Sequence, residues 1–122
     1  MLILDANVWI GLFNVEDSQH KKAKNIFAEI NGEILIPEYI LVEVLNVLTE
    51  KASKKHADKF LSMVVAGDEI EIGFSSKDFL FRVIQQFLMH EGKKLSFIDQ
   101  SLLYLSQFHK VITFDKHLAK QL

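Results

Sequence analysis

Four acidic residues have types and positions that could form one chemical site. They are Asp5, Glu43, Asp99 and Asp115. Carboxylates brought close together repel one another, and either protons or cations must relieve that repulsion. Mg²⁺ prefers oxygen ligands and is typically held by one or two carboxylates together with substrate phosphate. If the fold brings these residues together, they form a metal site that can activate water for attack on a phosphodiester.

Each acid also has a simpler structural explanation. Asp5 and Asp115 follow predicted strands and could cap the helices that come next. Ser96 and Asp99 have the spacing of a capping box, with Asp in place of the preferred Glu. Glu43 could lie at the rim of its helix and reach solvent. These explanations account for each acid separately, but not for their accumulation at one edge of a sheet.

Three polar residues lie two or three positions from an acid. They are Asn7, Ser96 and Thr113. Such groups could orient water or contact phosphate beside a metal site. Hydrogen bonding within turns and caps explains them equally well.

The elements that must position these residues alternate between strands and helices. Short apolar runs predict strands over residues 2–4, 33–36, 70–74 and 110–113. Helical periodicity predicts helices over residues 7–12, 18–30, 38–51, 54–66, 76–90, 96–109 and 115–122. We expect Asp17 or Ser18 to cap the second helix, Pro37 to begin the third, and residues 91–94 to form a loop. This alternation predicts a parallel sheet with helices on both faces, whose carboxyl edge is where ligands bind.

Length and composition limit the remaining possibilities. The 122 residues fit a single domain, and 49% hydrophobic with 25% charged residues is typical of a globular protein. The absence of cysteine excludes thiolate metal sites and a disulfide framework. A net charge of −2 argues against a protein that binds nucleic acid through overall positive charge. It does not argue against an enzyme that contacts nucleic acid locally through a metal ion. No apolar run approaches the ~20 residues of a membrane helix and no secretory signal is present, so we expect a cytoplasmic protein.

Other functions of α/β domains fit less well. A phosphatase of the haloacid dehalogenase type would need a second Asp two positions after Asp5, where Asn7 cannot donate a proton. A response-regulator receiver would need an acidic pair after the first strand and a Lys after a late one, in the region where Thr113 stands. The five glycines form no G-x-G-x-x-G, no G-x-S-x-G occurs, and the histidines lack paired zinc spacing.

Four short segments together resemble the PIN-domain nucleases, particularly the VapC-type toxins of toxin–antitoxin pairs. They are Leu4–Asn7, Glu43 in its helix, Leu95–Asp99 and Ile112–Lys116. Each segment is short, but the four occur in the family's order and with similar spacing over nearly the whole chain. The resemblance implies a three-layer α/β/α sandwich around a parallel sheet of four strands, or of five.

The same resemblance implies an activity. The chain would be a Mg²⁺- or Mn²⁺-dependent endoribonuclease that hydrolyses RNA phosphodiester bonds with a metal-activated water, as the toxin of a type II toxin–antitoxin system. By similarity, Asp5, Glu43, Asp99 and Asp115 would be its catalytic metal ligands, and Asn7 a supporting polar residue. A PIN-like module that binds RNA or protein without catalysis is the alternative, which the presence of all four acids disfavours.

The implied partners are RNA as substrate, a cognate antitoxin protein, and a second copy of the chain in a homodimer. Trp9, Phe13 and Tyr39 could line an antitoxin groove by similarity, although packing in the core or at its rim explains them equally well. Many relatives add a strand after the last helix, whereas this chain stops at Leu122. We therefore expect the fifth strand to be absent or supplied otherwise.

Overall fold

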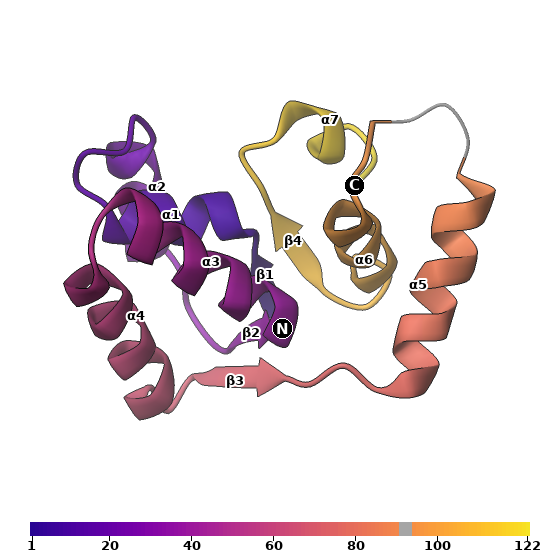
Figure 1. Ribbon diagram of the computed structural model, residues 1–122, viewed down its shortest axis with the longest axis horizontal. Helices are drawn as coiled ribbons and strands as arrows, with labels where there is room; N and C mark the ends of the chain where they lie inside the picture. The colour runs from indigo at the N-terminus through magenta and orange to yellow at the C-terminus, as the bar shows by residue number, and fades with distance from the viewer. Residues whose placement is uncertain (91–93) are drawn as a thin grey trace.

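The central feature of the computed structural model, which describes residues 1–90 and 94–122, is one parallel sheet (Figure 1). Its four strands, in order across the sheet, are β3 (Ile70–Gly73), β2 (Ile34–Pro37), β1 (Leu2–Leu4) and β4 (Lys110–Ile112). Every neighbouring pair is parallel. All four predicted strands are confirmed, with each boundary within one residue of its prediction. The predicted loop over residues 91–94 lies outside the described residues except for Lys94.

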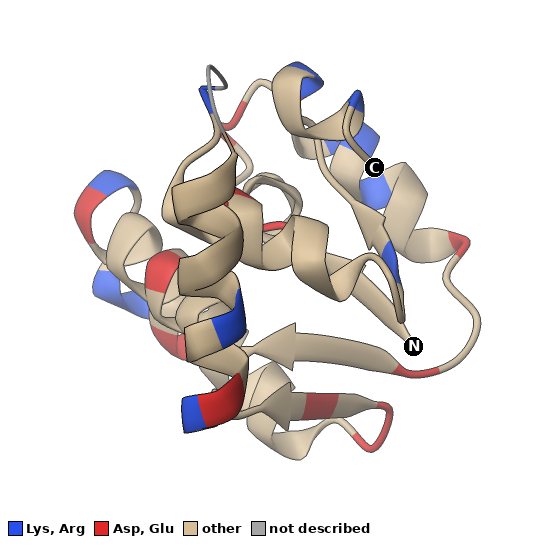
Figure 2. Cartoon of the chain, turned by 90° about the vertical axis from the view of Figure 1, so that its right-hand side faces the viewer, with Lys and Arg blue, Asp and Glu red and all other residues tan. Residues whose placement is uncertain are grey.

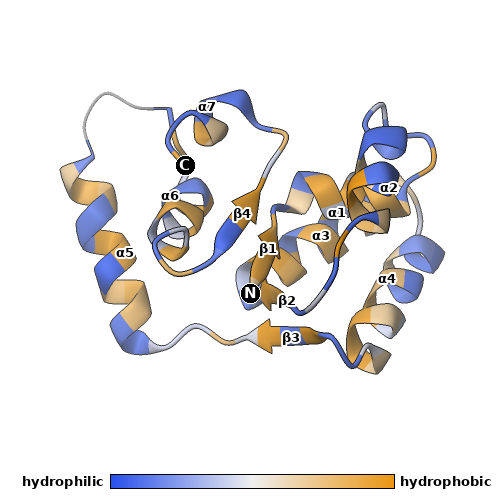
Figure 3. Cartoon of the chain, turned by 180° about the vertical axis from the view of Figure 1, so that it is seen from behind, coloured by the Kyte–Doolittle hydropathy of each residue, from blue (hydrophilic) through white to orange (hydrophobic). Residues whose placement is uncertain are grey.

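Helices cover both faces of this sheet. One side carries α1 (Ala6–Phe13), α2 (His20–Ala28), α3 (Glu38–Lys51) and α4 (Lys54–Ala66), and the other carries α5 (Lys77–Met89), α6 (Phe97–Leu105) and α7 (Lys116–Ala119) (Figure 1). The predicted three-layer α/β/α architecture is confirmed. The strands β1 and β2 are largely hydrophobic, as expected for central strands that helices cover (Figure 3), whereas the edge strand β3 carries the exposed Glu71. Among the described residues, none of the helices has the length and apolar content of a transmembrane span.

Helix boundaries follow the predictions where the apolar pattern is strong. Helices α3 and α4 match residue for residue, but α2 begins at His20 rather than at residue 18. The predicted cap is wrong because the Asp17 carboxylate accepts a hydrogen bond from the backbone N of Gln19 at 2.8 Å, which closes a turn before the helix. Pro37 is the last residue of β2 and the N-cap of α3, not its first helical residue. Its missing N–H is tolerated there because β2 ends at this point.

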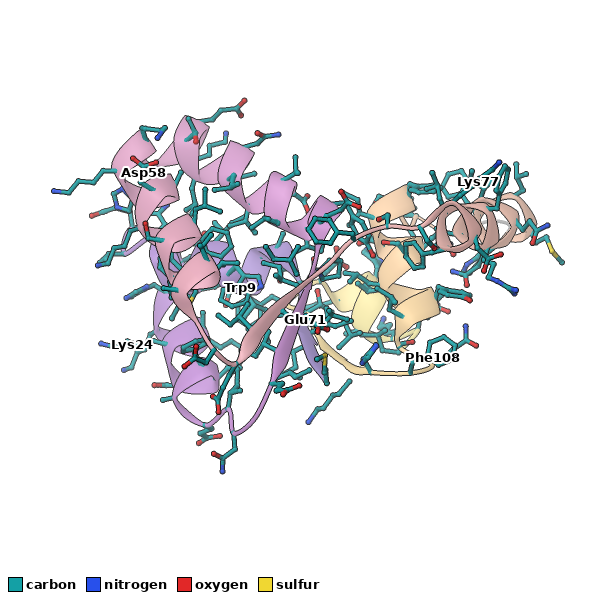
Figure 4. All side chains as sticks on the ribbon, turned by 90° about the horizontal axis from the view of Figure 1, so that it is seen from below. Trp9, Lys24, Asp58, Glu71, Lys77 and Phe108 are labelled. Atoms are coloured by element: carbon teal, nitrogen blue, oxygen red, sulfur yellow. The ribbon has the colours of Figure 1, made fainter. Side chains whose placement is uncertain are left out.

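The core between the sheet and helices α1–α4 is built around Trp9, which is fully buried (Figure 4). The ring of Phe60 meets the Trp9 ring edge-on with centroids 5.4 Å apart, and the Phe27 ring lies 5.9 Å away. Trp9 therefore does not line an open groove, contrary to the expectation from similarity. Gly11 lets α1 approach α2, since a Cβ at Gly11 would lie only 3.2 Å from the Cβ of Ala23.

Phe60 is fully buried in this packing, so its truncation is expected to be costly. We expect Phe60→Ala to reduce the free energy of unfolding by about 3–5 kcal/mol, because it opens a cavity beside Trp9. Phe108→Ala is the matched control, since the Phe108 side chain is 64% exposed, and it should change stability far less. Urea denaturation of the two variants measures the difference. Similar losses in both would show that the core is not organised around this contact.

Candidate acidic site at the sheet edge

The carboxyl ends of β1 and β4 bring Asp5 and Thr113 together. The backbone N of Asp5 donates to the carbonyl of Ile112 at 2.9 Å, which continues the pairing of the two strands by one residue. Thr113 follows directly and donates its hydroxyl to Oδ2 of Asp5 at 2.7 Å. Asp5 is only 6% exposed, so this bond holds a buried carboxylate. The register of two neighbouring strands thus fixes the centre of the site.

Thr113 also connects Asn7 and Asp115 to this centre. Its Oγ1 accepts hydrogen bonds from Nδ2 of Asn7 at 3.3 Å and from the backbone N of Asp115 at 3.0 Å. Oδ1 of Asn7 accepts from the backbone N of Phe114 at 3.2 Å. A hydroxyl has one donor and two acceptor positions, and all three are used here. The structure therefore gives Thr113 and Asn7 defined contacts beside Asp5.

The capping hydrogen bonds considered from the sequence are also present. Oδ1 of Asp5 accepts from the backbone N of Ala6 at 2.7 Å, and Asp115 caps α7 through its Oδ1. Ser96 and Asp99 form a reciprocal capping box at the start of α6. In Asp99 and Asp115 these bonds occupy one carboxylate oxygen, and the other has no hydrogen-bond partner among the described residues. Capping therefore orients Asp99 and Asp115 and leaves one oxygen of each carboxylate without a hydrogen bond from the described residues.

The charges of neighbouring acids act on Asp5 and on Glu43. Burial raises the pKa of Asp5, the hydrogen bonds from Thr113 and Ala6 oppose that effect, and the charges of Asp99 and Asp115 add to it. Burial likewise raises the pKa of Glu43, assisted by the charges of Asp5 and Asp99. Asp5 is thus electrostatically coupled to Asp99, Asp115 and Glu43, whereas a common site for all four acids stays a prediction.

Two further residues beside the site were not predicted for it. The Nζ of Lys22 lies 4.9 Å from the centre of the Phe114 ring, next to Asp115 in the chain. Ser101 is 2% exposed and donates its hydroxyl to the carbonyl of Ile98, one position before Asp99. Nothing in the local pattern distinguishes Ser101 from any helical serine or Lys22 from a surface lysine. Elsewhere charges of both signs are interspersed on the face shown in Figure 2.

Over residues 1–90 and 94–122, no group of three or more His, Asp or Glu side chains is arranged closely enough to hold a metal ion together. The charges of these acids affect one another, but no three of the carboxylates are close enough to coordinate one ion together. An ion at this edge would therefore take one or two of these carboxylates at a time. That is the number with which Mg²⁺ is typically held in proteins, with water completing its coordination.

The three-layer fold and its acidic strand ends define an α/β domain with a site at the carboxyl edge of a parallel sheet. The family model of the PIN domain matches residues 2–121, so the chain belongs to the PIN domain family. A search of curated proteins finds no match.

Two solved structures share this fold. The structure of Mycobacterium tuberculosis VapC20, a toxin that cleaves the sarcin-ricin loop, is similar with a TM-score of 0.86 and 15% identity, covering 98% of this chain and 94% of that one. The structure of VapBC2 from Rickettsia felis bound to a promoter DNA fragment is similar with a TM-score of 0.66 and 16% identity, covering 98% of this chain and 91% of that one. At these identities the likeness confirms the fold.

The raised pKa of Glu43 predicts a dependence of stability on pH. A carboxyl group whose pKa is raised by folding stabilises the native state when protonated, and that contribution is lost as the pH rises through the native pKa. Without divalent ions, Glu43→Gln should therefore stabilise the protein at pH 7, and the gain should shrink toward pH 4. We expect less than about 1 kcal/mol, because Glu43 is only partly buried and solvent screens the repulsion.

The measurement is thermal unfolding at a series of pH values in EDTA. The exposed Glu50 on the same helix provides the control, and Glu50→Gln should leave the stability unchanged. Destabilisation by Glu43→Gln at pH 7 would contradict the electrostatic description of the site.

Proposed function

We propose that this PIN-domain protein is a Mg²⁺- or Mn²⁺-dependent endoribonuclease and the toxin of a type II toxin–antitoxin system. The proposal is supported by the buried Asp5, which Thr113 holds at the carboxyl ends of β1 and β4. It is supported further by the charges of Asp99 and Asp115 that act on Asp5 and by those of Asp5 and Asp99 that act on Glu43. A structural role alone explains the caps, but gives no reason to place four acids in one electrostatic environment. We take residues 1–122 as one such domain.

The donor set fits a hard divalent cation. The candidate ligands are all carboxylate oxygens, which suit Mg²⁺ and Mn²⁺, and Asp99 and Asp115 each keep an oxygen outside the protein's hydrogen bonds. Asp5, Glu43, Asp99 and Asp115 would hold the ion, one or two at a time. Its positive charge would relieve the repulsion that raises the pKa of Asp5 and Glu43.

The chemistry divides between the ion and the residues. When bound, a divalent cation supplies Lewis acidity to a phosphate and lowers the pKa of water. Glu43 has no hydrogen-bond partner among the described residues, and its raised pKa makes its carboxylate a better base for the proton of an attacking water. Thr113 and Asn7 keep Asp5 oriented at the strand end. Lys22, whose Nζ lies 4.9 Å from the centre of the Phe114 ring, is a candidate cationic contact for the phosphate.

The proposed partners follow from the family and its solved members. One similar structure is a toxin that cleaves the sarcin-ricin loop, and another is a VapBC2 assembly bound to promoter DNA. By analogy, RNA is the proposed substrate of this chain and a cognate antitoxin its proposed protein partner. Both would be met in the cytoplasm.

A homodimer is also proposed, and the outer face of α5 is its candidate surface. Phe81, Leu88 and Met89 on this helix are 54%, 75% and 81% exposed. Helix α5 packs against α6 and stands at the edge of the molecule (Figure 1). On this helix Asp78 forms an ion pair with Arg82. In a two-fold symmetric dimer, Asp78 of each copy could instead pair with Arg82 of the other copy.

The activity is tested by cleavage of RNA with and without a divalent ion. We expect cleavage with Mg²⁺ or Mn²⁺, none in excess EDTA, and a loss of about 10²-fold or more in Asp99→Asn, which retains a capping side chain but not the charge. Asp68→Asn, a turn residue outside the site, is the control and should be fully active. Cleavage in excess EDTA, or by Asp99→Asn, would rule out the metal-nuclease mechanism. RNA binding without cleavage under every metal condition would instead identify a non-catalytic module.

The dimer is tested by sedimentation. Leu88→Asp should convert a dimer into a monomer, because it buries a charge in an apolar contact. Val65→Asp on α4 is the matched control, since Val65 is 73% exposed on the opposite side of the sheet, and it should leave the mass unchanged. A wild-type monomer at high concentration, or a dimer that survives Leu88→Asp, would exclude this surface.

A further inference from the structure

A buried polar contact joins α5 to α6 behind the acidic site. Gln100 of α6 is only 2% exposed, and Gln86 reaches it from α5. The Nε2 of Gln86 donates to the backbone carbonyl of Gln100 at 2.8 Å and to its side-chain Oε1 at 2.6 Å. The Nε2 of Gln100 lies 2.6 Å from Nδ1 of His90, the C-cap of α5. We call these three residues the glutamine network.

The chemistry of the groups fixes the direction of each hydrogen bond in this network. A backbone carbonyl only accepts, so Gln86 must present its N–H₂ group to the carbonyl of Gln100. The second N–H of the same nitrogen needs an acceptor, which orients Oε1 of Gln100 toward α5. This orientation turns the N–H₂ group of Gln100 toward His90, whose Nδ1 must then accept. The network therefore requires a neutral imidazole with its proton on Nε2.

The glutamine network holds the turn of α6 that carries Asp99. Asp99 directly precedes Gln100, and the backbone N of Gln100 donates to the carbonyl of Ser96 at 3.0 Å in the same turn. The capping box fixes the Asp99 side chain to its own helix, but does not fix that helix to the rest of the protein. Gln86 supplies the second constraint, because it binds the carbonyl of Gln100 from α5.

We propose that Gln86 and His90 are positioning residues for Asp99, and that they act through Gln100 to fix where the Asp99 carboxylate lies. The proposal rests on the proposed metal-dependent function and adds residues from a helix that carries none of the four acids. The charge of Asp99 acts on Asp5 and on Glu43, so a shift of α6 would alter the surroundings of both. Metal affinity commonly falls when the hydrogen-bonded supports of a ligand are removed.

A purely structural role for the network predicts a different result. Contacts that only hold α5 against α6 contribute to the free energy of unfolding, and their loss leaves the affinity of the folded protein for a metal ion unchanged. A positioning role predicts weaker metal binding by protein that is still folded. Metal affinity measured well below the unfolding transition of every variant therefore separates the two roles.

The experiment measures Mn²⁺ binding by isothermal titration calorimetry at such a temperature. Gln86→Met keeps the length of the side chain and removes both donors, so it should raise the Mn²⁺ Kd about 10-fold. Gln85→Met is the matched control, because Gln85 is the exposed neighbour on the same helix, and it should bind Mn²⁺ as the wild type does. Equal Mn²⁺ affinities in Gln86→Met and Gln85→Met would overturn the positioning role.

His90 provides a second test, because its acceptor can be replaced. His90→Asn places an amide oxygen near the position of Nδ1 and should keep the wild-type Mn²⁺ affinity. His90→Leu removes the acceptor and should weaken Mn²⁺ binding as Gln86→Met does. In the wild type at about pH 8, where imidazole is ordinarily neutral, the nitrogen NMR spectrum should place the His90 proton on Nε2. A proton on Nδ1, or equal affinities in the two variants, would overturn the network.

Hydrogen exchange without metal separates this inference from the proposed function. The backbone N–H groups of Asp99 and Gln100 donate to Ser96 in the first turn of α6, and they should exchange faster in Gln86→Met than in Gln85→Met. Faster exchange in a protein that neither binds Mn²⁺ nor cleaves RNA would support the network while the nuclease proposal fails. Mn²⁺-dependent cleavage with unaltered Mn²⁺ affinity in Gln86→Met, whether or not exchange changes, would overturn the inference and leave the nuclease intact.

Discussion

The constraint on which the proposed site depends is the repulsion between the buried Asp5 carboxylate and the charges of neighbouring acids at the edge of one parallel sheet. The backbone contributes to it, because the pairing of β1 with β4 places Asp5 beside Thr113, and the caps of α6 and α7 orient Asp99 and Asp115, whose charges act on Asp5. Burial and like charge raise the pKa of Asp5 and of Glu43. A cation bound beside these carboxylates at neutral pH would offset their mutual repulsion.

Capping and chemistry are compatible roles for the same acids. A helix N-terminus favours a negative charge, so the first turns of α6 and α7 stabilise Asp99 and Asp115 while they orient them. Each cap engages one oxygen and leaves the other with no protein partner among the described residues. The helices thus act as rigid supports for side chains that we propose to bind an ion. Glu43 also lines a mainly apolar groove between α3, α5 and the start of α6.

Much of the fold could be predicted because its signals are local. The apolar stripes of α3 and α4 set their boundaries, and the alternation of strands with helices required a parallel sheet. The four acids were singled out from the sequence because each follows a strand or lies in a helix, and their joint role stays a prediction. The contact of Asp5 with Thr113 spans 108 positions and depends on which strands are neighbours, which no local pattern encodes. The start of α2 was missed because a turn at Asp17 competed with a cap. The stacking of Tyr39 on Phe79 joins α3 to α5 and is encoded by no local pattern.

The central claim is that these acids bind a divalent cation, and its most direct test is to locate one. Crystals grown or soaked with Mn²⁺ should show an anomalous difference peak roughly 2.1 Å from a carboxylate oxygen of one or two of the four acids. Asp99→Asn crystals treated identically should show a weaker peak or none. A peak bound elsewhere, or no peak at this edge at saturating Mn²⁺, would contradict the account.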